Sequence, residues 1–377
     1  MSLLALNDEQ REVRDLARRF ADDVVASGAA EWDRTHTFPK DVFAQLGELG
    51  LMGVCVPAEL GGAGTDFLSY VLLREELSRG DAGVGVTVAV HTSACTLPLI
   101  AHGSDEQRQR LVPALAQGHE IGAFALTESG SGSDAGAMLS RVADDRITGS
   151  KQWITNGSHA HVFLVFAREG GRDGAPSCFV VRRGADGFRA VREEEKMGLN
   201  SSSTADLVFE DTPGELLGER GAGMRIALST LDGGRIGIAA QAVGIAQAAL
   251  DVATSYAKER RTFGKPIGGH QAIQQKLADM QTAIEAARAL TWRAARLKEA
   301  GHPHTVEGAQ AKLLASRTAR EVTGEAIQVL GGYGYTKEFP VERYYRDAKV
   351  TEIYEGTSEI QRLVIARALL GEAARAD

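Results

Sequence analysis

The spacing of the apolar residues changes twice along this 377-residue chain, and that change restricts the fold more than any other feature. The pattern is helical up to about residue 119, strand-like with Gly, Asp and Asn turns over 120–213, and helical again over 214–377. A helix–β–helix order excludes an alternating βαβ dinucleotide-binding fold. We therefore predict an α+β protein, mostly α, with a helical domain at residues 1–119, a β domain at 120–213 and a helical bundle domain at 214–377.

The last third carries a long apolar stripe. Its members step by four, three, four and three residues, so they lie on one face of a helix. The stripe consists of Ile273, Leu277, Met280, Ile284 and Ala287. Such a seam is typical of helices that pack into a bundle.

Charge and cysteine content exclude several classes of function. There are 42 Lys and Arg against 50 Asp and Glu, a net charge of −8, which does not suit a nucleic-acid binder. The cysteines, Cys55, Cys95 and Cys178, are too few for a disulfide framework or a zinc site, so we expect a reducing, cytoplasmic location and no metal. We read no apolar run near membrane-spanning length and no signal peptide in Met1–Arg11, so we expect no membrane association.

The first candidate for chemistry is the glycine-rich stretch from Thr127 to Gly136, directly after a strand-like run. Glycines let a ligand approach the backbone and expose successive N–H groups, which suits a phosphate or the edge of a flat heterocycle. The residues that follow look like strands and turns, whereas a Rossmann site needs a helix there. On this stretch alone, an ordinary glycine-rich loop is the competing interpretation.

The second candidate is the segment 151–157, which presents Trp153 and Thr155 on one face of a strand. An aromatic wall beside a hydroxyl group would suit a ring-shaped cofactor, although a lone Trp more often belongs to the core. The dipeptide Asn156-Gly157 that ends the segment predicts a tight hairpin.

The third candidate is Glu355, which precedes a predicted helix that Thr357 or Ser358 caps and that runs to about Leu369. A carboxylate on a glycine-flanked loop can project into a cleft and act as a base. Without further context, a solvated or capping glutamate is the simpler interpretation.

Taken together, these segments resemble the acyl-CoA dehydrogenase family of flavoproteins over nearly the whole chain, and short-chain (butyryl-CoA) members most closely. The motifs that carry the resemblance are Ala125–Glu128 with Gly130–Asp134, Lys151–Gly157, Glu259–Gly264, Gln328–Gly334 and Ile353–Thr357. The resemblance implies an N-terminal helical domain, a middle β-barrel-like domain and a C-terminal four-helix bundle. FAD would lie between the last two domains, in a homotetramer that acts in fatty acid β-oxidation.

The resemblance also implies a set of FAD-binding residues in two groups. Residues of the same subunit that would contact the flavin are Phe124, Leu126, Thr127, Gly132, Ser133, Trp153, Thr155, Thr357 and Glu359. Residues that would reach the pyrophosphate and adenosine from the neighbouring subunit are Arg260, Phe263, Gln271, Gln328 and Gly332. An Arg suits this place because its planar fork pairs with two phosphate oxygens.

For the acyl-CoA substrate, the resemblance implies contacts from Ser133, Asp232, Arg235, Tyr354 and Gly356, although a surface cation remains an alternative for Arg235. Glu355 would be the catalytic base. Some family members place the catalytic Glu where this chain has Gly234, and a glycine cannot serve.

The implied reaction is α,β-dehydrogenation to a trans-2-enoyl-CoA, with electrons passed on to electron-transferring flavoprotein. Glu355 would take the α proton while flavin N5 takes the β hydride. A glutamate has an ordinary pKa near 4.3, so exclusion of water must raise its pKa toward the working range. A short straight acyl chain is favoured, with a pocket floor near 86–95. The open alternatives are a branched-chain dehydrogenase, an oxidase, and a non-catalytic member that binds FAD.

Overall fold

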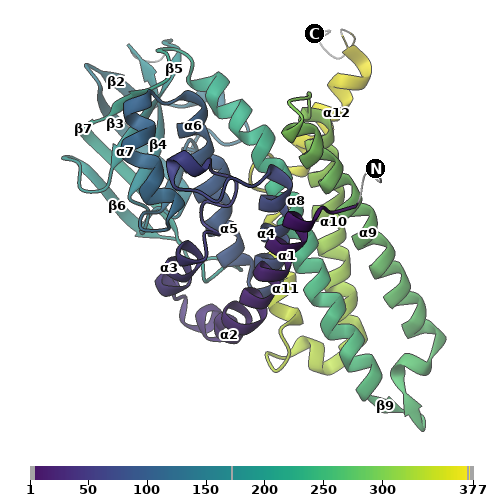
Figure 1. Ribbon diagram of the computed structural model, residues 1–377. Coiled ribbons are helices and arrows are strands. Elements are labelled where there is room, and N and C mark those ends of the chain that lie inside the picture. Colours follow the sequence, from purple (N-terminus) through teal and green to yellow (C-terminus); the bar gives the residue numbers. More distant parts are fainter. Residues whose placement is uncertain (1–4, 171–172, 372, 374–377) are drawn as a thin grey trace.

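The computed structural model describes residues 5–170, 173–371 and 373. Figure 1 shows N-terminal helices in the middle of the molecule, a β-sheet at one end and long C-terminal helices that extend toward the other end. The helices are α1 (Asp8–Phe20), α2 (Ala26–Thr35), α3 (Lys40–Glu48), α4 (Phe67–Gly80), α5 (Ala82–Ala89), α6 (Leu97–His102), α7 (Asp105–Ala116), α8 (Gly223–Glu259), α9 (Gln271–Glu299), α10 (Thr305–Leu330), α11 (Val341–Val350) and α12 (Ser358–Leu370). Two π-helical turns, η1 (Ala21–Val25) and η3 (Val90–Thr96), continue α1 and α5, and short 3-10 turns are η2 (Ala58–Leu60), η4 (Ala135–Ala137), η5 (Ile267–Gly269) and η6 (Gly331–Tyr335).

The strands are β1 (Gly122–Ala125), β2 (Arg141–Ala143), β3 (Arg146–Thr155), β4 (Val162–Glu169), β5 (Pro176–Arg182), β6 (Phe188–Glu193), β7 (Thr204–Pro213), β8 (Glu215–Leu217), β9 (Arg261–Thr262) and β10 (Lys265–Pro266). All but the last two form one mixed sheet in the order β6-β7-β3-β2-β4-β5-β8, with β1 parallel to β4. β9 and β10 form a separate two-stranded ribbon.

The sheet is not a closed barrel, which corrects the expected barrel-like middle domain. Closure would require pairing between the edge strands β6 and β8, and no such pairing occurs in the described chain. β6 is exposed along almost its whole length and carries Arg189, Arg192 and Glu193, so it offers no apolar face to close upon. β8 has only three residues.

The hairpin prediction at Asn156-Gly157 was also wrong. β3 pairs with β2 and β7, whereas β4 pairs with β1, β2 and β5, so the strands on either side of this turn are not neighbours. Asn156 has a left-handed backbone (φ 66°), as the dipeptide suggests. Its side-chain amide donates to the carbonyls of Thr87 and Gly122, so it joins the sheet to the N-terminal helices.

The N-terminal and C-terminal helices share one core. α4 is buried on nearly all sides and lies beside α1, α8 and α9. In the bundle, Met280, Ile284 and Ala287 are buried, while Ile273 and Leu277 are half-buried against the core, so the apolar stripe faces the interior as expected. Asn7 caps α1 through a reciprocal hydrogen-bond pair with Gln10.

Two helical stretches in the described chain, Ala82–His102 and Gly223–Glu259, are long and apolar enough to cross a membrane by length and composition. This corrects the expectation that no stretch approaches that length. In each stretch, 83% of the apolar window is buried inside the fold, which is the pattern of core helices. Their apolarity is therefore accounted for by packing.

Candidate active site

The loop that carries Glu355 connects α11 to α12. Thr357 caps α12, because its hydroxyl accepts a hydrogen bond from the Ile360 N–H at 3.3 Å. Glu355 and Gly356 both have left-handed backbones, with φ of 51° and 88°. A non-glycine residue in that conformation is uncommon and has to be held by its surroundings.

Lys312 of α10 holds this loop at both ends. Its ammonium group donates to the carbonyls of Thr351 at 2.9 Å and Gly356 at 2.8 Å. Ser316 and Gln361 add one donor to each of the same carbonyls. Because Lys312 is only 1% exposed, burial lowers its pKa to about 8 despite the attraction of Glu355. Sequence reasoning missed this residue, although a lysine in the middle of an Ala-rich helix face was a signal.

Glu355 is half-buried, and its side chain is not part of the helix cap. Burial raises the pKa of Glu355, while the nearby charges of Lys312, Arg74 and Arg235 oppose that shift. Its Oε2 atom is buried and has no hydrogen-bond partner among the described residues. The carboxylate lies against α8 at Gly234, where a Cβ would stand 2.0 Å from Oε2. A side chain at position 234 would therefore occupy the same place as the Glu355 carboxylate.

Four of the five predicted substrate residues lie on this loop or on α8, namely Asp232, Arg235, Tyr354 and Gly356, whereas Ser133 lies on the glycine-rich loop. Arg235 is 6% exposed and pairs with Asp232 at 2.7 Å, so it is not a surface cation. Asp232 also accepts a hydrogen bond from Thr305. Tyr354 donates its hydroxyl proton to Gln241 of α8.

The glycine-rich loop and the Trp153 strand lie side by side, since the Gln152 N–H donates to the Thr127 carbonyl at 2.9 Å. Trp153 is 55% exposed with φ 58°, at an irregularity of β3, so it does not belong to the core. No described heavy atom lies within 4 Å of a Cβ built on Gly130 or Gly132, so the loop faces open space.

A buried ion pair that the sequence did not reveal supports this loop. Lys151 donates to the Leu126 carbonyl at 3.0 Å and to Glu128 at 2.7 Å. Glu128 also accepts from the N–H groups of Leu139 and Ser140. Burial lowers the pKa of Lys151 to about 8, and the attraction of Glu128 opposes that shift.

The predicted FAD-binding residues fall into two separate regions. Those of the sheet and of the start of α12 lie near the glycine-rich loop and the Glu355 loop; they are Phe124, Leu126, Thr127, Gly132, Ser133, Trp153, Thr155, Thr357 and Glu359. A second set lies on the far end of the bundle, around β9, β10 and η6, which we call the bundle tip (Figure 1). This set is Arg260, Phe263, Gln271, Gln328 and Gly332, and all five residues are exposed. One chain does not bring the two regions together.

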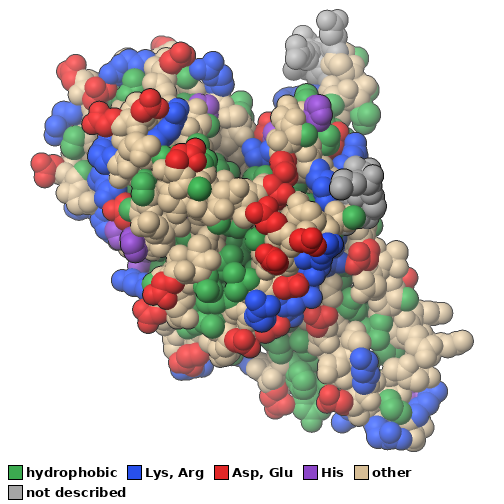
Figure 2. All heavy atoms as spheres, in the orientation of Figure 1, with side chains coloured by type: hydrophobic (Ala, Val, Ile, Leu, Met, Phe, Trp, Pro, Cys, Tyr) green, Lys and Arg blue, Asp and Glu red, His purple; other side chains and the backbone are tan. Residues whose placement is uncertain are grey.

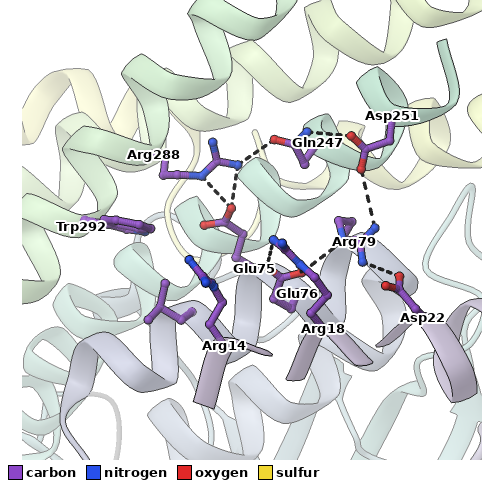
Figure 3. Close-up of a pocket in the computed structure, with 11 residues that line it drawn as sticks. Arg14, Arg18, Asp22, Glu75, Glu76, Arg79, Gln247, Asp251, Arg288 and Trp292 are labelled. Carbon is purple, nitrogen blue, oxygen red and sulfur yellow. Dashed lines mark hydrogen bonds and ion pairs between the residues drawn. The ribbon is translucent and has the colours of Figure 1, made fainter. Parts of the chain in front are cut away.

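The hollow in Figure 3 is a different feature, on the seam between the N-terminal helices and the bundle, where Figure 2 shows acidic and basic side chains gathered. Its volume is about 440 Å³. Arg288 pairs with Glu75 at 2.7 Å and Arg79 bridges Glu76 and Asp22, so ion pairs occupy its wall. None of the predicted site residues lines this hollow, so it is separate from the predicted site. In the part of the chain that the structure describes, no three His, Cys, Asp or Glu residues group as metal ligands.

Comparisons with known proteins agree on one family. The family models for the acyl-CoA dehydrogenase N-terminal, middle and C-terminal domains match residues 7–119, 123–212 and 221–370. A short-chain specific acyl-CoA dehydrogenase from Bos taurus, a mitochondrial protein, is 49% identical over 97% of this chain and 91% of its own length.

Two solved structures extend this agreement to the fold. Butyryl-CoA dehydrogenase from Megasphaera elsdenii matches with a TM-score of 0.95 and 43% identity, covering 97% of this chain and 99% of that one. A chain from a structure described as the electron transferring flavoprotein of Acidaminococcus fermentans matches with a TM-score of 0.96 and 45% identity, covering 98% and 99%.

Proposed function

The chain belongs to the acyl-CoA dehydrogenase family, and we propose that it oxidises short straight-chain acyl-CoA thioesters to trans-2-enoyl-CoA with Glu355 as the catalytic base. The observation that carries the proposal is the buried Glu355 carboxylate, held on a strained loop by Lys312 and left with a free oxygen in the described structure. Similarity to a short-chain specific enzyme and to a butyryl-CoA dehydrogenase supports the chain length.

FAD is the cofactor of this family. The residues present fit a flat ring, because the half-exposed Trp153 indole lies on the segment next to a glycine-rich loop that faces open space. Thr127 and Ser133 of the glycine-rich loop and Thr155 of β3 would hold the ring by hydrogen bonds. Bound FAD supplies the acceptor for the hydride that leaves the β carbon.

The α proton of an acyl thioester is weakly acidic, so the base needs a raised proton affinity. Burial provides it for Glu355, and the loop fixes the carboxylate before substrate arrives. The charges of the three nearby cations oppose this rise in pKa. The backbone N–H of Glu355 donates to no described residue and is free to stabilise charge on the thioester oxygen.

A subunit boundary completes the cofactor site in this proposal. Arg260 and Phe263 on the bundle tip would reach the FAD pyrophosphate and adenosine of a neighbouring copy, in a homotetramer. Electron-transferring flavoprotein is the proposed electron acceptor, and the match to the Acidaminococcus fermentans chain supports it.

Anaerobic titration of the FAD-loaded protein with acetyl-, butyryl-, hexanoyl- and isobutyryl-CoA tests the proposal. We expect loss of the yellow colour with butyryl-CoA first. Colour that no thioester removes would contradict the proposal and favour a non-catalytic FAD-binding member. Fast recoloration in air with product bound would instead identify an oxidase.

A further inference from the structure

Arg74 of α4 is a fully buried arginine without a carboxylate partner in the described structure. It is 0% exposed, and its Nη2 atom donates to the Gly237 carbonyl at 3.2 Å and, at the 3.5 Å limit, to Gln241 Oε1. Its Nε and Nη1 atoms have no partner among the described residues. Burying a guanidinium whose donors are not all paired costs folding free energy, so such a residue is expected to have a functional role.

The other cations near this part of the fold have acceptors inside the chain, although the Nε atom of Arg235 also lacks a partner among the described residues. Lys312 donates to two carbonyls, and Arg235 pairs with Asp232. On the opposite side of α4, Arg288 pairs with Glu75. Arg74 therefore has two buried donor atoms without a partner in the described structure, whereas Arg235 has one and is paired with Asp232.

Arg74 lies further along α8 than the catalytic carboxylate. Glu355 contacts α8 at Gly234, whereas Arg74 contacts it at Gly237 and Gln241. At a rise of about 1.5 Å per residue, these contacts stand roughly 4.5 to 10 Å beyond Gly234 along the helix axis. That separation matches the far end of a short acyl chain whose α carbon lies at Glu355.

A second buried hydrogen-bond donor, the Tyr70 hydroxyl, lies near Gly237 of α8. Tyr70 precedes Arg74 by one turn of α4, and its hydroxyl stands 3.1 Å from where a Gly237 Cβ would be. This hydroxyl is buried, and no described residue accepts its proton. Burial raises the pKa of Tyr70, and Arg74 and Ser93 oppose that rise. The Tyr70 hydroxyl thus has Ser93 as one weak partner nearby, whereas two donor atoms of Arg74 have none.

The π-helical turn η3 also packs against α8, and all of its residues are buried. Val90, Ser93 and Ala94 are 8%, 5% and 6% exposed, while His91 and Thr92 between them are fully buried. These residues fall within the expected pocket floor at 86–95. π-helical turns often mark functional positions.

We propose that the acyl group of the substrate ends in a carboxylate that Arg74 and Tyr70 bind, so that the enzyme acts on short ω-carboxyacyl-CoA thioesters. The inference rests on the proposed function and narrows its substrate class. A carboxylate supplies acceptor oxygens that match the planar fork of an arginine, whereas a plain alkyl tail supplies none. The reaction itself is unchanged: Glu355 takes the α proton, the β hydride leaves for the acceptor that bound FAD would supply, the α,β double bond forms and the tail carboxylate stays intact.

Length-matched thioesters test the inference. The FAD-loaded wild-type protein should oxidise glutaryl-CoA with kcat/KM about 100-fold or more above that for valeryl-CoA, because a site built to hydrogen-bond rejects an analogue that lacks the group. Adipyl-CoA against hexanoyl-CoA repeats the comparison. Arg74→Met should abolish or reverse the preference, and Arg74→Lys should keep part of it.

Calorimetry of product binding gives a readout that does not depend on turnover. Glutaconyl-CoA should bind the wild-type protein more tightly than 2-pentenoyl-CoA, and Arg74→Met should remove the difference. Arg288→Met is the control, since it removes another, partly exposed arginine that pairs with Glu75 of α4, and it should leave both ratios unchanged.

Three outcomes would count against the inference. If valeryl-CoA is oxidised as fast as glutaryl-CoA by the wild-type protein, Arg74 does not select a carboxylate, while the proposed function stands. If Arg74→Met shifts only the pH profile of valeryl-CoA oxidation, its role is to tune Glu355. If neither thioester reduces the flavin, the proposed function itself fails.

Discussion

The Glu355 loop and the bundle tip differ in almost every physical respect, although α11 joins the η6 part of the tip to the loop. At the loop, charged groups are buried and Lys312, Ser316 and Gln361 satisfy the backbone carbonyls from within the chain. At the tip, large aromatic side chains face outward: Phe263 is 96% exposed and Tyr335 is 88% exposed. One region is complete in a single chain, and the other presents a surface that something else must cover.

The largest expected effect is a loss of activity at the Glu355 loop, the region that a single chain completes. Glu355→Gln keeps the shape of the side chain but removes its capacity to accept a proton. We expect the reductive step with butyryl-CoA to slow by about 10⁴-fold while FAD stays bound. Stopped-flow bleaching under anaerobic conditions measures the rate. Glu352→Gln is the control on the same loop, because Glu352 pairs with Lys349 and Arg320 and should matter little. Equal loss in both variants would mean that the loop is merely fragile.

Lys312→Met tests whether the Glu355 loop needs the two hydrogen bonds that Lys312 donates to its carbonyls. Two carbonyls lose their shared donor, and Glu355 loses the nearest of the cations that oppose its pKa shift. We expect kcat to fall about 100-fold through misplacement of the carboxylate. The pKa of Glu355 should rise, so the ascending limb of the pH–rate profile should move to higher pH. Lys349→Met, an exposed lysine nearby, should leave the profile in place; a profile that also stays in place in Lys312→Met would reduce Lys312 to a structural role.

Phe263→Asp tests the region that one chain leaves incomplete. In the proposed homotetramer this side chain would be covered, so a charge there should weaken assembly by about 30-fold or more, as for other buried aromatic contacts. Sedimentation would detect the shift, and FAD should be released more readily. Val191→Asp is the matched control, an exposed apolar residue on β6. An unchanged oligomer in Phe263→Asp would show that the tip is not an interface.

The two regions also differ in how far the sequence predicts them. Local signals were sufficient for the order of helical and β segments and for the start of α12 at Thr357, because capping and apolar spacing act over a few residues. They also placed Glu355 directly before that helix. The exposed aromatic side chains of the tip, by contrast, have no local signal, and only family resemblance suggested them.

Long-range contacts explain what the sequence did not reveal. Lys312 reaches carbonyls 39 and 44 residues away, and Arg74 contacts Gly237, 163 residues away. The expected barrel failed for the same reason, since the pairing of sheet edges is not encoded near either edge. The Asn156-Gly157 turn formed with the expected backbone, but distant carbonyls of Thr87 and Gly122 decided where its strands go.

The smallest expected effect concerns α11, which connects the two regions. Asp347 of this helix is buried and accepts a hydrogen bond from the Leu199 N–H at 2.6 Å. Burial and the charge of Asp81 raise the pKa of Asp347 to about 7. An acid whose pKa is raised by folding stabilises the protein below its ordinary pKa, and that stabilisation is lost as the pH rises through about 7. Asp347→Asn keeps an acceptor for Leu199 and cannot ionise. Its unfolding midpoint should therefore fall less between pH 5 and pH 8 than that of the wild type, by about 2 to 4 °C in scanning calorimetry. A parallel decline in both proteins would mean that Asp347 does not titrate in this range, and that the junction between loop and tip is insensitive to pH.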